Sequence, residues 1–421
     1  MRGISEPVVF HCDADAFFAA CHIAEDPSLA SVPMVVAGDP AERHGIVLTA
    51  SYPARQYGVR TAMPLQAALR ICPALVVVRP APDLYRARSR QMRAALPQFS
   101  PLVEPLSIDE AWLDMTGGWH LWGSDPVAAA AALQAAVRDA CGITVSVGVS
   151  ANKMLAKQVS DWSKPAGITV LWPEEVPERL WPRPVAELYG VGPHGAERLH
   201  TAGVDTIGQL ASLDDERLGR WLGASGPRLR SRARGHDSAP VVRPSAGDAR
   251  SVGAETTLPR DLSAAAEARP VLLALADHVA SRLRASGFRG RTVTLKYKTR
   301  RFVSHTHQMQ LAAATCYTDD VYQAAIQLFL TRPDPSPVRL LGITVSGFAV
   351  SRQAQLDFGE EGGGDQREAA RAAAVDRIRQ RFGAHAIGRA RLLVEAPAPG
   401  GSSFERDESG EEVTGRSTPK T

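Results

Sequence analysis

The stretch that most constrains this chain is PLSIDEAWLD, residues 105–114, where two adjacent carboxylates interrupt an apolar run of strand character. Because neighbouring side chains of a strand point to opposite faces, Asp109 and Glu110 cannot both be buried against one face. A buried, unpaired carboxylate is costly unless it becomes neutral. The pair is therefore either a solvated strand end or part of a site that needs two carboxylates.

A second acidic strand lies far upstream, in VVFHCDADAFFAA, residues 8–20. Asp13 and Asp15 are two positions apart, so they share a face on an extended chain. If the two strands are neighbours, Asp13, Asp109 and Glu110 form a cluster of hard oxygen ligands, the kind that Mg²⁺ prefers. Two such ions about 3.5–4 Å apart are the usual apparatus for in-line attack at phosphorus.

Three motifs in this order, HCDADAFF, SYPAR and PLSIDEAWLD, resemble those of the Y-family translesion DNA polymerases of the DinB type. The resemblance extends over about residues 1–352 and implies an α+β multidomain fold with a ferredoxin-like palm, fingers, a helix-hairpin-helix thumb and an α/β little finger. The implied domains are the palm (1–18 and 81–171), the fingers (19–80), the thumb (172–240), the little finger (248–352) and a C-terminal tail (353–421).

The resemblance also assigns roles to single residues. Those that would hold two Mg²⁺ ions are the catalytic Asp13, Asp109 and Glu110, with the backbone carbonyl of Ala14. Those that would bind the nucleotide are Phe17, Phe18, Tyr52, Arg55 and Lys157. Phe18 is the expected steric gate, whose ring excludes a ribose 2′-hydroxyl by a built clash. Asp15 is interpreted as structural.

The stretch 45–65 predicts a strand ending at Thr49 and a helical turn that begins near Ser51. Tyr52 and Arg55 are three residues apart and lie on one face of that turn. A hydroxyl and a guanidinium displayed at a helix start suit a triphosphate. The alternative is a plain surface stack of the two side chains; the resemblance favours contact with the β- and γ-phosphates.

Two other pairs have an ordinary interpretation beside the functional one. Phe17 and Phe18 could simply be core residues at a strand–helix junction. Lys153 and Lys157 are one helical turn apart and could be a solvated face. The resemblance places Lys157 against the incoming triphosphate, where its charge stabilises the transition state.

Further elements fit the palm. Residues 84–99 and 125–140 predict helices, the second capped by Ser124 or Asp125, and the alternating segment 143–150 predicts a strand. The order strand, helix, strand, helix, strand is that of a ferredoxin-like sheet.

The proline-rich stretch 173–184 indicates a domain boundary, and a GVG sequence follows at 190–192. Glycines between two helical stretches leave backbone amides free to face an anion, which predicts a hairpin that contacts DNA phosphates. Gly190 and Gly192 are the expected contacts. Pro193 stands where relatives often have lysine, so one phosphate contact is expected to be weaker.

A basic stretch, RTVTLKYKTRRFVSHTHQ (291–308), is expected to be one strand that contacts the DNA backbone. Residues 241–352 hold fifteen lysines and arginines against eight acidic residues, so positive charge is local although the net charge is only +3. The expected contacts are Arg291, Lys296, Lys298, Arg300 and Arg301. The alternative is a basic solvated strand. His305 and His307 are expected to be exposed polar residues rather than metal ligands.

The tail contains QAQLDF (353–358), which fits the QxxLxF peptide that docks on the bacterial sliding clamp. Gln353, Leu356 and Phe358 are the expected anchors. Residues 366–382 predict an arginine-rich helix without an assigned function, and residues from about 396 onward have the composition of a disordered segment.

Composition adds limits. The five cysteines form no CxxC pair and are expected to be reduced. A signal-peptide pattern and a membrane-spanning run of about 20 apolar residues are both missing. We therefore expect a cytoplasmic protein without membrane contact, a monomer whose partners are primer-template DNA, dNTPs and the clamp.

The sequence thus predicts a template-directed DNA polymerase of low fidelity that acts in translesion synthesis. Two alternatives remain open at this point. One is a catalytically inactive relative that docks on the clamp as a scaffold, which the three intact acidic residues disfavour. The other is a palm-fold nucleotide cyclase, which needs neither thumb nor little finger.

Overall fold

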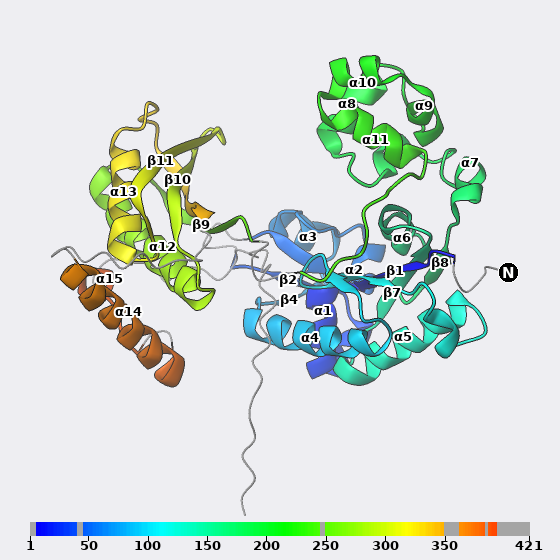
Figure 1. Cartoon of the computed structure of the whole chain (residues 1–421), viewed down its shortest axis with the longest axis horizontal. Coiled ribbons are helices and arrows are strands. Elements are labelled where there is room, and N and C mark those ends of the chain that lie inside the picture. Colours follow the sequence, from blue (N-terminus) through cyan, green and yellow to red (C-terminus); the bar gives the residue numbers. More distant parts are fainter. Residues whose placement is uncertain (1–5, 40–44, 245–248, 349–361, 384–385, 394–421) are drawn as a thin grey trace, which may run out of the picture. The chain divides into compact units, whose positions relative to one another are not determined.

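The computed structural model describes residues 6–39, 45–244, 249–348, 362–383 and 386–393 (Figure 1). By its internal contacts the chain divides into two units, one of residues 1–37 and 46–244 and the other of 38–45 and 245–421. Each unit has its own core. Within the described ranges, no helix is both long and apolar enough to span a membrane.

The first unit is built on a five-stranded sheet with the strand order β5-β6-β1-β7-β8. The strands are β1 (Val9–Ala14), β5 (Val103–Pro105), β6 (Glu110–Asp114), β7 (Val145–Ser150) and β8 (Ile168–Val170). β1 lies in the centre and runs antiparallel to both β6 and β7, whereas β7 and β8 are parallel. The two acidic motifs therefore lie on adjacent strands, as the sequence predicts.

The two faces of this sheet differ in character because side chains alternate along β1. Phe10 and Cys12 belong to the main apolar core with α1 (Phe17–Glu25), α4 (Pro82–Ala95) and α5 (Pro126–Cys141). The opposite face is covered by α6 (Lys153–Ser160). His11 and Asp13 have the other parity along β1 and belong to this second face.

The helices around the sheet begin and end close to the predicted residues. α4 ends at Ala95, and a short 3₁₀ turn follows it. α5 is capped by Asp125, whose carboxylate accepts a hydrogen bond from the backbone N–H of Ala128 at 2.8 Å. Capping by this side chain satisfies a donor that the helix itself leaves unpaired.

A smaller sheet in the same unit has the order β3-β2-β4. Its elements are β2 (Met34–Ala37), β3 (Val47–Ala50), β4 (Val76–Val78), α2 (Tyr52–Gln56) and α3 (Leu65–Ile71). Ser51 caps α2 by accepting from the backbone N–H of Ala54. The predicted helical turn therefore begins where expected, directly after β3.

A helical segment completes the first unit. Its helices are α7 (Val176–Arg179), α8 (Pro193–Thr201), α9 (Ile207–Ser212), α10 (Asp215–Leu222) and α11 (Ser225–Ala233). Their apolar side chains share one core with Met154, Leu155 and Val159 of α6. This shared core fixes the helical segment to the sheet through α6.

The second unit is a four-stranded antiparallel sheet with the order β11-β10-β12-β9, packed on two helices. The elements are β9 (Ser251–Leu262), β10 (Gly290–Thr299), β11 (Ser304–Thr315), β12 (Val338–Phe348), α12 (Ala265–Ala285) and α13 (Thr318–Leu330). Val293, Leu295 and Tyr297 of β10 are buried, while Thr294 and Lys296 between them are only half-buried.

Two sequence predictions about this unit were wrong. The basic stretch 291–308 is not one strand but parts of β10 and β11, joined by a turn at residues 300–303. Phe302 has φ 64° there, a left-handed conformation that a sequence without glycine, asparagine or proline did not signal. His305 and His307 are not exposed: both are half-buried and stack on the Tyr297 ring, with centroids 4.8 and 5.8 Å away.

The predicted arginine-rich helix is present as α14 (Gly362–Phe382), and α15 (Ala390–Leu393) follows it. α14 is joined to α12 by two ion pairs of opposite polarity. Asp376 accepts from Arg284 at 2.6 Å, and Arg379 pairs with Asp277 at 2.8 Å. All four side chains are about four-fifths buried or more, so the helix is part of the second unit.

Candidate active site

The pairing of β1 with β6 places Asp13 directly opposite Glu110. In an antiparallel pair, residues opposite each other project from the same face of the sheet. Asp109 precedes β6, and its backbone carbonyl accepts from the Ala14 N–H at 3.0 Å. The alternation argument therefore does not apply to Asp109, and both members of the acidic pair face one site.

That site is a cleft of about 240 Å³ in the first unit. Its lining combines four carboxylates and three cationic side chains: Asp13, Asp109, Glu110, Asp161, Arg55, Lys157 and Lys164. Ala14, whose carbonyl is an expected metal ligand, also lines it. The three predicted acidic residues from distant parts of the chain thus converge, and the cationic side chains offset much of the negative charge of the cleft.

Two lysines neutralise the carboxylates directly. Lys157 on α6 lies with its Nζ 3.1 Å from Asp13 Oδ2 and 2.7 Å from Glu110 Oε2. Lys164 Nζ is 2.5 Å from Asp13 Oδ1 and 2.8 Å from Asp161 Oδ1. Lys153, one turn from Lys157, instead pairs outside the cleft with Glu104 at 2.6 Å. The two lysines of α6 therefore have different surroundings.

The pKa values of the acidic pair diverge. Burial raises the pKa of Asp109 to about 6, and the charges of Glu110 and Asp13 add to this, although the Ser107 hydroxyl donates a hydrogen bond that opposes it. Burial also acts to raise the pKa of Glu110, but His11 and Lys157 outweigh it and lower that pKa to about 2. The neighbours bring the pKa of Lys157 above its usual range despite burial.

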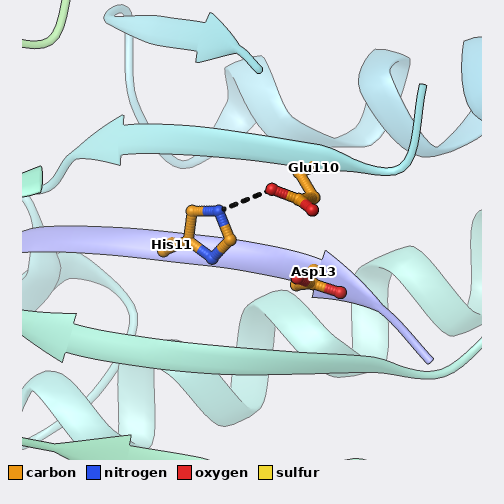
Figure 2. Close-up of side chains that lie close together, drawn as sticks. All are labelled: His11, Asp13 and Glu110. Carbon is orange, nitrogen blue, oxygen red and sulfur yellow. Dashed lines mark ion pairs between the residues drawn. The ribbon is translucent and has the colours of Figure 1, made fainter. Parts of the chain in front are cut away.

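The site also fits a divalent cation. One potential ligand atom each from His11, Asp13 and Glu110 lies within 4.8 Å of the others (Figure 2). Carboxylate oxygens with room for water and phosphate oxygens are the ligand set of Mg²⁺. His11 Nε2 is 3.3 Å from Glu110 Oε2, so the histidine is an additional partner of this cluster.

Asp15 does not share the environment of Asp13. It lies beyond the end of β1, and its carboxylate accepts from Ser146 Oγ at 2.7 Å, from the Ala166 N–H at 2.8 Å and from Tyr52 at 3.4 Å. These donors use the carboxylate to hold the turn after β1. The geometry is that of a structural residue, as the sequence interpretation has it.

Phe17 and Phe18 also differ from each other in their surroundings. Phe17 is buried in the main core, and its ring also borders the cleft. Phe18 is half-buried, lines the cleft and packs on Tyr85 with ring centroids 4.5 Å apart. Phe18 therefore lies at the cleft and is packed against Tyr85.

Tyr52 and Arg55 are stacked, with the guanidinium 4.7 Å from the ring centroid. Arg55 donates from Nε to the Ala50 carbonyl at 3.0 Å and lines the cleft. Tyr52 is not among the lining residues; burial raises its pKa to about 12, with a further contribution from Asp15. Arg55 thus both stacks on Tyr52 and lines the cleft.

The expected DNA contacts are spread over both units. Gly190 has φ 101° and lies against the Arg232 guanidinium, which donates to the Tyr189 carbonyl at 3.1 Å. Around Gly192, which caps α8, a Cβ would meet no atom within 4 Å. Pro193 is the first residue of α8 and has no N–H to offer an anion.

In the second unit the five expected basic residues are not equivalent. Arg291 donates to the carbonyls of Leu311 and Ala312, and Lys296 pairs with Glu255 at 2.6 Å. Lys298 is half-buried on the same side of β10 as Lys296, two residues away. Arg300 and Arg301 lie exposed in the turn after β10. The predicted clamp anchors Gln353, Leu356 and Phe358 lie outside the described residues.

Sequence reasoning missed two residues of the cluster, Lys164 and His11. Lys164 is seven positions after Lys157, a spacing that returns to the same side of a helix, although α6 itself ends at Ser160. His11 is two positions before Asp13 on β1, so its parity already indicated the same face. The signal for His11 was therefore available once the strand was assigned, whereas Lys164 lies beyond the end of α6, where helical spacing no longer predicts its position.

Comparison with known proteins agrees with this geometry. Residues 12–161 match the impB/mucB/samB family, residues 173–204 the IMS family HHH motif, and residues 249–358 the impB/mucB/samB family C-terminal domain. The chain belongs to this family, the Y-family DNA polymerases.

Its relatives identify a narrower group. The chain is 37% identical to DNA polymerase IV of Alkaliphilus oremlandii, with 92% of this chain and all of that protein covered. It is 40% identical to DNA polymerase IV of Moorella thermoacetica, over 93% and 98% of the two chains.

Solved structures agree. A Y-family DNA polymerase chimera, Dbh-Dpo4(243-245)-Dbh, matches with a TM-score of 0.73 and 26% identity, over 81% of this chain and 99% of that one. An insertion ternary complex of Dbh DNA polymerase matches with a TM-score of 0.59 at the same identity and the same coverage. The predicted fold class of palm, fingers, helix-hairpin-helix thumb and little finger is confirmed. Enzymes of this family are nucleotidyltransferases that use divalent metal ions.

Proposed function

We propose that this chain is a template-directed DNA polymerase of low fidelity that adds dNTPs to a primer 3′-hydroxyl during translesion synthesis. The observation that carries the proposal is the convergence of Asp13, Asp109 and Glu110 in one cleft with three cationic side chains. The family, with its relatives named DNA polymerase IV, supports the same activity. The carboxylates are suitable ligands for a divalent cation, and the cationic side chains suit an anion such as a nucleotide triphosphate.

Two Mg²⁺ ions are the cations that we propose for this site. Asp13, Asp109 and Glu110, with the Ala14 carbonyl, would hold them. When bound, such ions lower the pKa of the attacking hydroxyl and neutralise the charge of the departing pyrophosphate. Besides burial, the charges of Glu110 and Asp13 raise the pKa of Asp109, and a cation among the three carboxylates would relieve this repulsion.

The remaining groups bind and orient the nucleotide. Arg55, Lys157 and Lys164 line the cleft, so their positive charges would hold the triphosphate and stabilise negative charge that develops on it. Phe18 is held against Tyr85 and would clash with a ribose 2′-hydroxyl. Tyr52 would act from beside Arg55, whose guanidinium it supports.

The domain boundaries and DNA contacts remain as proposed from the sequence. The hairpin around Gly190 and Gly192 and the basic β10–β11 region would bind DNA phosphates without reading bases. Residues 353–358 would dock on the sliding clamp, and the family model ends at this motif. An enzyme that extends primers on bacterial DNA would act in the cytoplasm, where we propose that it is a monomer.

Primer extension with Mg²⁺ and each dNTP tests the chemistry. Asp13→Asn and Asp109→Asn are expected to lower the rate by about 10³-fold or more, because each removes a charge that holds the metal. Asp114→Asn is the matched control, since Asp114 ends the same strand as Glu110 and does not line the cleft. Extension by the wild type also separates this enzyme from an inactive scaffold. Undiminished extension by the Asp109 variant would contradict the proposal.

The clamp proposal has a separate test. A variant without residues 353–358 is expected to lose stimulation by the sliding clamp while its unassisted synthesis stays unchanged. A variant that lacks only residues 396–421 is the control and should keep the stimulation. Equal stimulation of both variants would remove the docking motif from the account.

A further inference from the structure

His11 is a wholly buried histidine for which the proposed chemistry gives no role. Its side chain has no exposed surface, and its ring contacts the Trp112 indole edge-on at 5.5 Å. It lies two residues before Asp13, on the face of β1 that α6 covers. A buried imidazole needs partners for both nitrogens, because an unsatisfied polar atom is costly in an apolar site.

Both nitrogens have a polar neighbour. Nδ1 is hydrogen-bonded to Ser160 Oγ on α6 at 3.0 Å. Nε2 is 3.3 Å from Glu110 Oε2 on β6 (Figure 2), an ion-pair distance without the geometry of a full hydrogen bond. Ser160 Oγ is also 2.9 Å from the Lys157 carbonyl. The histidine therefore connects α6 to the acidic strand.

The position of the proton follows from these neighbours. A carboxylate can only accept, whereas a serine hydroxyl can donate or accept. A neutral ring with its hydrogen on Nε2 and an imidazolium both direct an N–H toward Glu110. Only the neutral ring with its hydrogen on Nδ1 would set a lone pair against the carboxylate. That last form is repulsive beside a carboxylate, so an N–H faces Glu110 in the two favoured forms, the neutral ring with its hydrogen on Nε2 and the imidazolium.

The contact is specific for one oxygen of Glu110. Lys157 Nζ donates to the same Oε2 at 2.7 Å. In the described part of the chain, the structure shows no hydrogen bond to Oε1. Glu110 is thus held at Oε2 from two sides, by residues of β1 and α6, and Oε1 is the oxygen that it can offer to a ligand.

We propose that His11 is a positioning residue that fixes the Glu110 carboxylate, through Nε2–H to Oε2, for metal binding by Oε1. The inference rests on the proposed function. Partners of this kind orient ligating carboxylates, and their loss costs about 10- to 100-fold in metal affinity. Ser160 sets the ring orientation from the other side.

Two substitutions of His11 separate positioning from packing. His11→Phe keeps a planar ring beside Trp112 but removes both nitrogens. His11→Gln keeps an amide N–H about where Nε2–H lies. Mn²⁺ binding is measured by calorimetry on the complex with a dideoxy-terminated primer-template and dNTP, so that no reaction occurs, and the Mg²⁺ dependence of extension is measured in parallel.

The phenylalanine variant is expected to bind Mn²⁺ about tenfold more weakly, and the glutamine variant within about threefold of wild type. The Mg²⁺ concentration for half-maximal extension should shift alike, with kcat largely restored at saturating Mg²⁺. Wild-type metal affinity in the phenylalanine variant would overturn the proposal. Equal weakening in both variants would also overturn it, because the ring would then only fill space.

Ser160→Ala provides a second route if the phenylalanine variant does not fold. It leaves the imidazole in place but removes its anchor, so Mn²⁺ binding should weaken by about threefold. Unchanged Mn²⁺ affinity in this folded variant would contradict the role of Ser160 in orienting the imidazole of His11. A wild-type protein that neither binds Mn²⁺ nor extends primers would overturn the proposed function itself, whereas an active wild type with insensitive variants removes only the role of His11.

Discussion

One ion pair at the five-stranded sheet and one on the four-stranded sheet have nearly the same length, but the first is buried and the second is half exposed. In the first, Lys164 and Asp13 are 2.5 Å apart, and their side chains are 18% and 7% exposed. In the second, Lys296 and Glu255 are 2.6 Å apart, and both side chains are about two-fifths exposed. Distance alone does not distinguish the two pairs, whereas burial does.

This difference is the one expected between the proposed site of chemistry and the proposed DNA-binding surface. Charges in a cleft are poorly screened, so each one strongly affects the pKa and the ligand affinity of its neighbours. Charges on an open sheet are screened by water and salt, and each contributes little. Substitutions in the cleft should therefore have large, specific effects, and those on the open sheet should have small, salt-dependent ones.

The largest contrast is expected for Asp109→Asn, which should abolish extension yet stabilise the metal-free fold. Burial raises the Asp109 pKa from 3.8 to about 6, so ionisation destabilises the folded state above that pH. The upper limit is about 3 kcal/mol at about pH 7.5, from roughly two pKa units at about 1.4 kcal/mol each.

The sign of the pH dependence is fixed by the raised pKa. The wild-type carboxyl is fully tolerated below its unfolded pKa, and its contribution is lost as the pH rises through about 6. The variant's advantage should thus shrink between about pH 6 and pH 4. Urea unfolding in EDTA over this range measures it; an asparagine variant less stable than wild type at neutral pH would contradict the burial argument.

A smaller but more selective effect is expected at the cleft wall. Phe18→Ala removes a ring that is packed on Tyr85 and leaves room for a 2′-hydroxyl. The preference for dNTP over rNTP should fall by about 100-fold or more, because a built clash is lost rather than a contact. Kinetics of single-nucleotide insertion report the ratio directly. A preference as strong as that of the wild type would exclude Phe18 as the gate.

Next in size is the pair Lys164→Met and Lys153→Met. Both lysines are buried to a similar extent and pair with a carboxylate at about the same distance, but only Lys164 lines the cleft. Loss of Lys164 should raise the KM for dNTP by about tenfold, and loss of Lys153 by no more than about twofold. A similar KM in the two variants would mean that Lys164 only neutralises Asp13.

The same contrast explains what the sequence could and could not reveal. Asp13 and Glu110 were found because the three motifs in their order resemble those of the Y-family polymerases; alternation alone did not show that the two strands are adjacent. Lys164 was missed because it lies in the segment after α6, and neither helical nor strand periodicity predicts the conformation of that segment. The hairpin at 300–303 was missed because Thr, Lys and Arg continue without a turn residue, and Phe302 supplies the positive φ.

The error about His305 and His307 has a different cause. Alternate residues from His305 through Met309 to Leu311 share a face of β11, and two of them are apolar, so the inward direction was available in the pattern. The polar residue type suggested exposure, but the position of each histidine along the alternating strand determines which way its side chain faces. The docking of α14 could not be read from the sequence, because it depends on ion pairs with α12 rather than on an apolar stripe.

The smallest effects are expected on the open sheet, and they test the comparison most sharply. Lys296→Ala and Lys298→Ala should each weaken DNA binding by about threefold and reduce the slope of log K against log salt by about one. The loss should be the same for different DNA sequences, because phosphate contacts read no bases.

Glu255→Gln is a control that should change the DNA affinity in the opposite direction. It removes the partner of Lys296 and a negative charge from the same face, so DNA binding should become tighter by about twofold at low salt. Titrations of fluorescent primer-template at several salt concentrations measure the DNA affinity of the lysine variants and of Glu255→Gln. If the lysine variants keep the wild-type slope while Glu255→Gln still tightens binding, this face only modulates the local potential, and phosphate contacts must come from other residues. Large, salt-independent losses would instead mean that the open sheet behaves like the cleft, and burial would not be what separates the two regions.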